Sequence, residues 1–199
     1  MKSAVAALFA QTSAVTGVIE KYYGVVRPIT TEKYGTFPIA CTATKECSTP
    51  DHLYAAVPND RYTGIAYVEI GNTTMRLNPR FQSVVEYTIQ ARYVAWYNAA
   101  KLGFQSCDGQ EKIMLQAMRC TTETKQIEIA PGIRAEVEST LTQTSGDYSD
   151  IFRPYRYADR AHLLVWPYEA FALNFTLKMH VPAVCLNYDL PNPVTCINV

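Results

Sequence analysis

Residues Ser83 to Tyr97, SVVEYTIQARYVAWY, alternate between two kinds of side chain almost without exception. In an extended chain one face would carry the apolar set Val85, Tyr87, Ile89, Ala91, Tyr93, Ala95 and Tyr97. The opposite face would carry the polar set Glu86, Thr88, Gln90 and Arg92. A period of two residues is that of a β-strand with one buried face, so this stretch predicts a long, half-buried strand.

Residues Ala170 to His180 have the same period. Their apolar positions are Phe171, Leu173, Phe175, Leu177 and Met179. Two long strands that each have one apolar face are typical of an antiparallel sheet packed on one side.

Two other segments have helical spacing. Near the N-terminus it relates Val5, Leu8, Phe9, Thr12, Val15, Ile19 and Tyr22, with Ser3 as a possible cap and Gly24 as the stop. The start MKSAVAALFAQTSA is also similar to a signal peptide, but we expect an amphipathic helix of an intracellular product. Residues Gln110 to Arg119 fit a short second helix.

The sequence therefore predicts an α+β fold, with an antiparallel β-sheet or sandwich, an N-terminal amphipathic helix and a short second helix. We expect the core to include Leu8, Val15, Ile19, Val85, Tyr87, Ile89, Tyr93, Leu173, Phe175 and Leu177.

Turn-forming residues predict how the remaining elements are joined. Gly71-Asn72 and Pro131-Gly132 each predict a hairpin between the strands beside them. Asn98 to Gly103 predicts one helical turn with glycine as its stop. Shorter strands are expected at Val25 to Ile29, where Pro28 ends the strand, and at Leu163 to Trp166, before Pro167.

The 199 residues suit a single domain over 1–199. It would have three irregular segments: a long insertion at 36–62, a loop at 142–160 and an extended C-terminal tail at 186–199. Segments of this length without regular periodicity are usually functional or stabilised by a partner.

The charge balance limits the choice of partner. Lys plus Arg and Asp plus Glu are both 18, and no apolar run is long enough to cross a bilayer. We therefore expect no membrane and no sequence-specific nucleic acid as partners. The 14 tyrosines suit subunit interfaces, although tyrosine is equally at home in strands.

Six cysteines form three pairs that are close in sequence: Cys41 and Cys47, Cys107 and Cys120, Cys185 and Cys196. Each pair could close a local disulfide loop in an oxidising compartment, or remain as thiols in a cytosol. None has the C-x-x-C spacing of zinc or redox sites.

No motif in the chain indicates an enzyme. Sequence signatures of hydrolases, metalloproteases and nucleotide-binding proteins are absent, and His52, His162 and His180 are scattered. Asp147 and Asp150 lie close together in a segment typical of a solvated loop. We expect no catalytic residues, no cofactor and no metal.

The segment YSDIFRPYRYADR, residues 148–160, interleaves aromatic and arginine side chains. These residue types are enriched at interface hot spots, which makes the segment a candidate protein interface. Two other interpretations are an internally packed loop and a stacking surface for single-stranded nucleic acid. The interface candidates are Tyr148, Phe152, Arg153, Tyr155, Arg156, Tyr157 and Arg160.

The N-terminal helix, the one-faced strands, the junction YVAWYNAAKLG and the late stretch VWPYEAFALNFTLK together resemble tailed-bacteriophage structural proteins. The most similar kind is the neck, ring or tail-terminator subunit. The resemblance implies a non-enzymatic virion subunit, such as a head-tail connector, neck ring or tail component. It would form a homo-oligomeric ring with other virion proteins as neighbours, and would be assembled in the host cytoplasm. The alternative is a secreted β domain stapled by three disulfides, which acts in adhesion or ligand binding.

Overall fold

The computed structural model describes residues 2–31, 35–40, 55–77, 84–105, 108–130, 133–152, 155 and 158–182. Its strands form one seven-stranded sheet in the order β2-β1-β3-β4-β7-β6-β5. Their bounds are β1 Lys21–Thr31, β2 Gly35–Ala40, β3 Gly64–Leu77, β4 Val84–Asn98, β5 Gln126–Ala130, β6 Ile133–Ser145 and β7 Tyr168–Pro182. The predicted α+β fold is confirmed.

The two strands recognised from their alternation lie at the centre of this sheet. β4 and β7 pair antiparallel along their whole length, from Val84 opposite Pro182 to Asn98 opposite Tyr168. β3 joins the free side of β4 and β6 joins the free side of β7, both antiparallel. Among the strands that the structure describes, β1 and β3 are the one parallel pair.

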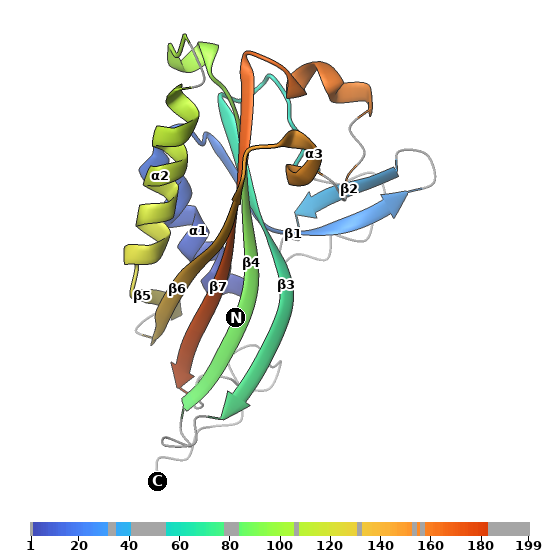
Figure 1. Ribbon diagram of the computed structural model, residues 1–199. Coiled ribbons are helices and arrows are strands. Elements are labelled where there is room, and N and C mark those ends of the chain that lie inside the picture. The colour runs from blue at the N-terminus through green and yellow to red at the C-terminus, as the bar shows by residue number, and fades with distance from the viewer. Residues whose placement is uncertain are drawn as a thin grey trace.

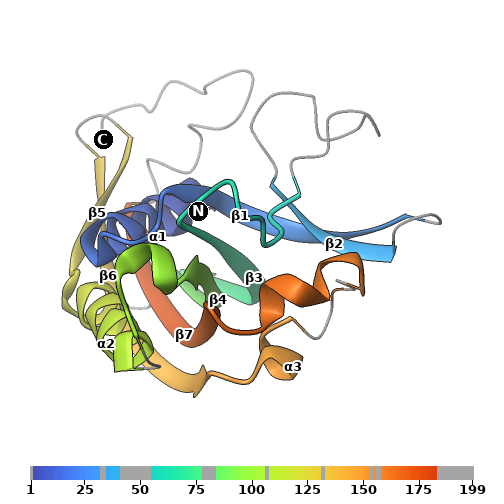
Figure 2. The same ribbon diagram turned by 90° about the horizontal axis from the view of Figure 1, so that it is seen from above.

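Two helices cover one face of the sheet, α1 (Lys2–Thr16) and α2 (Asp108–Glu123), as Figures 1 and 2 show. They bury the apolar set of β4 and β7 against Leu8 and Phe9, and the Phe9 ring stacks on Tyr93 at 5.4 Å. The hydroxyls of Thr12 and Thr121 lie 2.9 Å apart and join the two helices. Both predicted helices are confirmed, and the second is longer than the segment 110–119.

Most of the predicted core is buried. Ile19 and Tyr87 are half-buried and pack against the core, whereas Val15 is 45% exposed, so its prediction as a core residue is wrong. Val15 lies within α1 but beside its packed face, whose buried positions are Ala4, Val5, Leu8, Phe9, Thr12, Ser13 and Thr16. α1 stops at Thr16, with Gly17 in the left-handed region at φ 66°, rather than running on to Gly24.

A second core lies on the opposite face, at one end of the sheet. There Tyr67, Val94 and Trp96 are buried under α3 (Tyr148–Ile151), the 3-10 helix η4 (Ala158–Leu164) and the residues beside them. The expectation of a sheet covered on one side is therefore wrong at this end. The alternation of β4 ends at Val94, after which both faces carry apolar side chains.

One of the two predicted hairpins is confirmed. β5 and β6 pair antiparallel on either side of residues 131–132. The hairpin at Gly71-Asn72 is wrong, because β3 passes through these residues as one strand and pairs with β4 on both sides of them. The register shifts between Ile70 and Thr73, so the glycine marks a bulge rather than a turn. The long strand β4 pairs with both halves of β3 and so keeps them in one ladder.

β1 also extends beyond its predicted end. It continues through Pro28, which lies opposite Pro38 of β2, so residues 35–40 form a strand rather than the start of an irregular insertion. The carbonyl of Pro38 accepts from the Ala56 amide, 2.8 Å away, and so points away from β1. In an antiparallel pair the N–H of that residue would point the same way, and the prolines remove no bond between the two strands. Figures 1 and 2 show this hairpin projecting from the body.

The remaining boundaries are partly as expected. The turn at Asn98 to Gly103 is confirmed as the 3-10 helix η3 (Ala100–Leu102), with Gly103 at φ 76°. Residues 163 and 164 belong to η4 rather than to a strand, and β7 begins at Tyr168. Residues 142–145 of the expected loop belong to β6. The tail 186–199 lies outside the described residues.

Candidate interaction surfaces

The described aromatic residues of the segment 148–160 face the interior. Phe152 and Tyr155 are buried and Tyr148 is half-buried, all within the second core. The Tyr155 ring meets Tyr67 edge-on at 6.4 Å, and the Tyr148 hydroxyl donates to the Tyr168 carbonyl at 2.7 Å. For these three residues the internally packed interpretation holds, and their prediction as exposed interface residues is wrong. Their apolar rings complete a core that β4 alone leaves open.

The structure does not test the other interface candidates of this segment. Arg153, Arg156 and Tyr157 lie outside the described residues, and so does the side chain of Arg160. Their assignment as interface residues stays a prediction.

A polar network holds the same segment on the sheet. The Tyr155 hydroxyl donates to Glu69 at 2.5 Å, Arg92 lies 3.6 Å from the Glu69 carboxylate, and Arg92 also donates to the Asp150 carbonyl at 2.6 Å. Burial raises the pKa of Glu69, while the hydrogen bond from Tyr155 and the charge of Arg92 act in the opposite direction. These contacts therefore attach Asp150 and Tyr155 to β3 and β4.

The other half of this sheet face is polar and open. Basic and acidic residue types alternate in a row across neighbouring strands, in which Arg76 lies opposite Glu86, Glu86 opposite His180, and His180 opposite Glu136. The Glu86 carboxylate is 2.6 Å from Arg76 and 3.6 Å from His180. Opposite charges on facing positions stabilise the pairing of strands.

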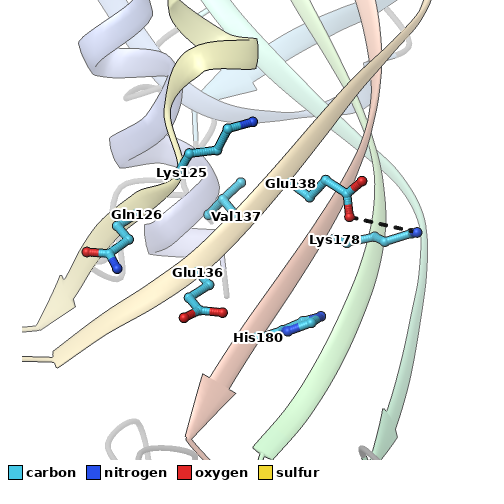
Figure 3. A pocket seen from close by; sticks show the side chains of 7 residues that line it. All are labelled: Lys125, Gln126, Glu136, Val137, Glu138, Lys178 and His180. Carbon is cyan, nitrogen blue, oxygen red and sulfur yellow. Dashed lines mark ion pairs between the residues drawn. The ribbon is translucent and has the colours of Figure 1, made fainter.

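A shallow pocket of about 300 Å³ lies at the end of this row (Figure 3). The side chains of Glu136 and Glu138 project from β6, and those of Lys178 and His180 project from β7. The Lys178 and Glu138 side chains approach to 4.0 Å. The lining is completed by Lys125, Gln126 and Val137. Its positive and negative groups lie side by side, so it presents no net charge that would select an anion or a cation.

A groove of about 580 Å³ separates the ends of the two helices, between Gln11 and Val15 of α1 and Gln116 and Cys120 of α2. Cys120 is a half-buried free thiol. A bridge to Cys107 would have to span α2, because Asp108, its neighbour in the chain, lies about 18 Å of helix rise before Cys120. Bridged cysteines have Cα atoms only about 4.4 to 6.8 Å apart, so this predicted pair is wrong. Cys41, Cys47, Cys107, Cys185 and Cys196 lie outside the described residues.

The tyrosines that the structure describes fit the strand interpretation better than the interface one. Tyr67, Tyr93 and Tyr97 are buried between the sheet and its covering layers. Burial raises the pKa of Tyr93, whose hydroxyl lies 3.0 Å from that of Ser13. These rings contribute to the two cores and are not available to other chains.

Apart from the outer sides of the terminal strands β2 and β5, two stretches of inner strands have no strand beside them among the described residues. The outer side of β3 has no strand beside it at residues 71–77, because β1 pairs only up to Glu69. The outer side of β6 has none at residues 138–145, because β5 pairs only up to Glu136. On the first edge every residue is exposed, including Met75 (65%) and Leu77 (62%). This edge was missed because the Gly71-Asn72 hairpin assigned the same residues to an internal pair.

No protein-family model and no curated protein matches the chain. Within the described ranges, no helix is both long and apolar enough to cross a membrane. The same ranges bring together no group of three or more His, Cys, Asp or Glu side chains that would hold a metal ion.

Proposed function

We propose that this protein is a non-enzymatic structural subunit of a virion, a phage head-tail connector, neck ring or tail component, and that it works as a member of a homo-oligomeric ring. The observation that carries the proposal is the open edge of β3, where residues 71–77, which include Met75 and Leu77, are exposed to solvent. A long exposed strand with apolar side chains is a template for pairing with another chain.

The charge of the chain supports self-association. With 18 positive and 18 negative side chains, identical subunits can pack side by side without the repulsion that a large net charge would cause. The row from Arg76 to Glu136 likewise carries both basic and acidic side chains on one sheet face. Such a face can meet another copy of itself without bringing only like charges together.

The secreted alternative receives less support. It relies on three local disulfides, and the free thiol of Cys120 removes one of them. The cysteines at 41, 47, 185 and 196 leave at most two local bridges for that interpretation.

The test is the assembly state of the purified full-length chain, measured by native mass spectrometry and negative-stain electron microscopy. We expect closed rings with one subunit number, and the protein in purified virions when their components are identified by mass spectrometry. A chain that stays monomeric at every concentration and is absent from virions would contradict the proposal.

A further inference from the structure

We propose that the open edge of β3 in one copy pairs antiparallel with the open edge of β6 in the next copy, with Arg76 beside Glu138 and Thr74 beside Thr140. The inference rests on the proposed function, and it names the contact that would join neighbouring subunits.

Strand direction allows this contact without turning either copy over. β3 and β7 run one way, while β4 and β6 run the other way, because each neighbouring pair among them is antiparallel. When the β3 of a second, equally oriented copy is added beside β6, the alternation of direction continues. Two different edges then meet with both copies in one orientation, which is the head-to-tail contact that closes into rings.

The backbone groups on the β6 edge point outward at suitable positions. The amide of Val137 donates to the Lys125 carbonyl at 2.8 Å, so the backbone groups of Val137 point away from β7. Backbone direction alternates along a strand, and Ser139 and Leu141 therefore point outward too. No described strand pairs with either residue on that side.

The matching positions on β3 follow from its pairing with β4. The amide of Asn98 donates to the Thr63 carbonyl, so the even-numbered residues of β4 direct their backbone groups toward β3. Their partners Thr74 and Arg76 point back toward β4, which leaves Thr73 and Met75 pointing outward. In the proposed register Met75 meets Ser139 and Thr73 meets Leu141, each in a position to exchange backbone hydrogen bonds.

Side chains match on both faces of the new pair. On the polar face, Arg76 and Glu138 have opposite charges and expose 70% and 67% of their side chains. On the helix face, Met75 would lie over the flank of α2 that faces away from the groove shared with α1. That flank carries the half-buried Met118 and the exposed Leu115. The contact would cover exposed apolar side chains of both copies.

The test uses the full-length chain with p-benzoylphenylalanine in place of Thr74. A mixture of this chain with isotope-labelled wild-type chain is irradiated, and cross-linked peptides are identified by mass spectrometry. We expect links between chains to residues 138–145. Thr30, exposed on the projecting hairpin, is the matched control position and should give no links there. Links from Thr74 to residues 71–77 of another chain, or to any other surface, would overturn the proposal.

A second variant tests the hydrogen bonds. Met75→Pro removes an amide that points outward, so the pairing with β4 should persist while the added strand is weakened. We expect the concentration of half-assembly to rise about tenfold, equivalent to about 1.4 kcal/mol. Val165→Ser, which removes a similarly exposed apolar side chain elsewhere, should leave it unchanged. Rings that form normally with Met75→Pro would refute the edge contact and leave the proposed function standing, whereas a wild-type chain that forms no rings would refute both.

Discussion

The two ends of β3 pair with the same neighbour but have opposite surroundings. Residues 64–68 are buried, and residues 71–77 are exposed, although both stretches are hydrogen-bonded to β4. The buried end has β1 beside it and the second core above it, and the exposed end has neither among the described residues. Pairing in a ladder therefore does not itself bury a strand. One end of β3 contributes to folding, and the other is available for contact.

The largest expected effect lies in the core that covers the buried end. Trp96 lies opposite Ile65, is 1% exposed, stacks on Tyr168 at 5.1 Å and donates to the Leu163 carbonyl at 2.7 Å. Trp96→Ala should lower the free energy of unfolding by about 3 to 5 kcal/mol in a urea titration. Trp166→Ala, at a tryptophan that is 51% exposed, serves as the control and should cost less than about 1 kcal/mol. Equal losses would show that the second core adds little stability.

Substitutions at the two ends of β3 test directly whether only the buried end contributes to stability. Ile65→Ala should cost about 2 to 5 kcal/mol, because a buried side chain leaves a cavity. Leu77→Ala, on the exposed end, should change the free energy of unfolding by less than about 0.5 kcal/mol. Both values come from chemical denaturation at low protein concentration, so that association between chains makes no contribution. A large loss for Leu77→Ala would mean that other parts of the chain cover this end.

A smaller effect is expected where the two ends meet. Tyr155→Phe removes the hydroxyl that donates to Glu69, and should lower the free energy of unfolding by about 1 to 3 kcal/mol. Thermal denaturation measures this loss, and proteolysis of residues 148–155 should become faster. Unchanged stability would indicate that Arg92 alone is a sufficient partner for the Glu69 carboxylate.

The smallest effect is a dependence on pH. Because burial raises the pKa of Glu69 above 4.5, the folded protein holds this proton more tightly than the unfolded chain does. The resulting stabilisation is full below the ordinary pKa and is lost as pH rises through the folded-state pKa. Glu69→Gln removes this dependence, so its stability relative to wild type should improve as the pH rises from the ordinary glutamate pKa through the raised folded-state pKa. Parallel curves for the two proteins would contradict the raised pKa.

The central strands could be predicted because their alternation is long and local. Fifteen residues of β4 keep one face apolar, and no other period fits them. The burial of Val94 and Trp96 on the second face was harder to predict. It depends on Phe152 and Tyr155, about 60 residues away in sequence, and no local pattern records that contact.

The errors at Gly71, Pro28 and Val15 have a common cause. Each prediction used a local signal alone. Gly71 and Pro28 are residues that ordinarily turn or end an element, and Val15 was placed by a helical spacing that was extended too far. In the folded chain a long partner strand carries β3 past Gly71, and Pro28 occupies a position that needs no amide. The same local bias explains the interface prediction, because Tyr148, Phe152 and Tyr155 have the composition of a hot spot and the burial of a core.

The facing prolines of the β1–β2 hairpin have a consequence for solubility. A projecting hairpin offers two ribbon edges on which further chains can stack into fibres. Pro28 sits where the backbone of β1 points outward, so this edge lacks a donor that a stacking strand would require, and on the β2 edge the Pro38 carbonyl is already bonded to the Ala56 amide. The hairpin can therefore extend into solvent without seeding the growth of an aggregate.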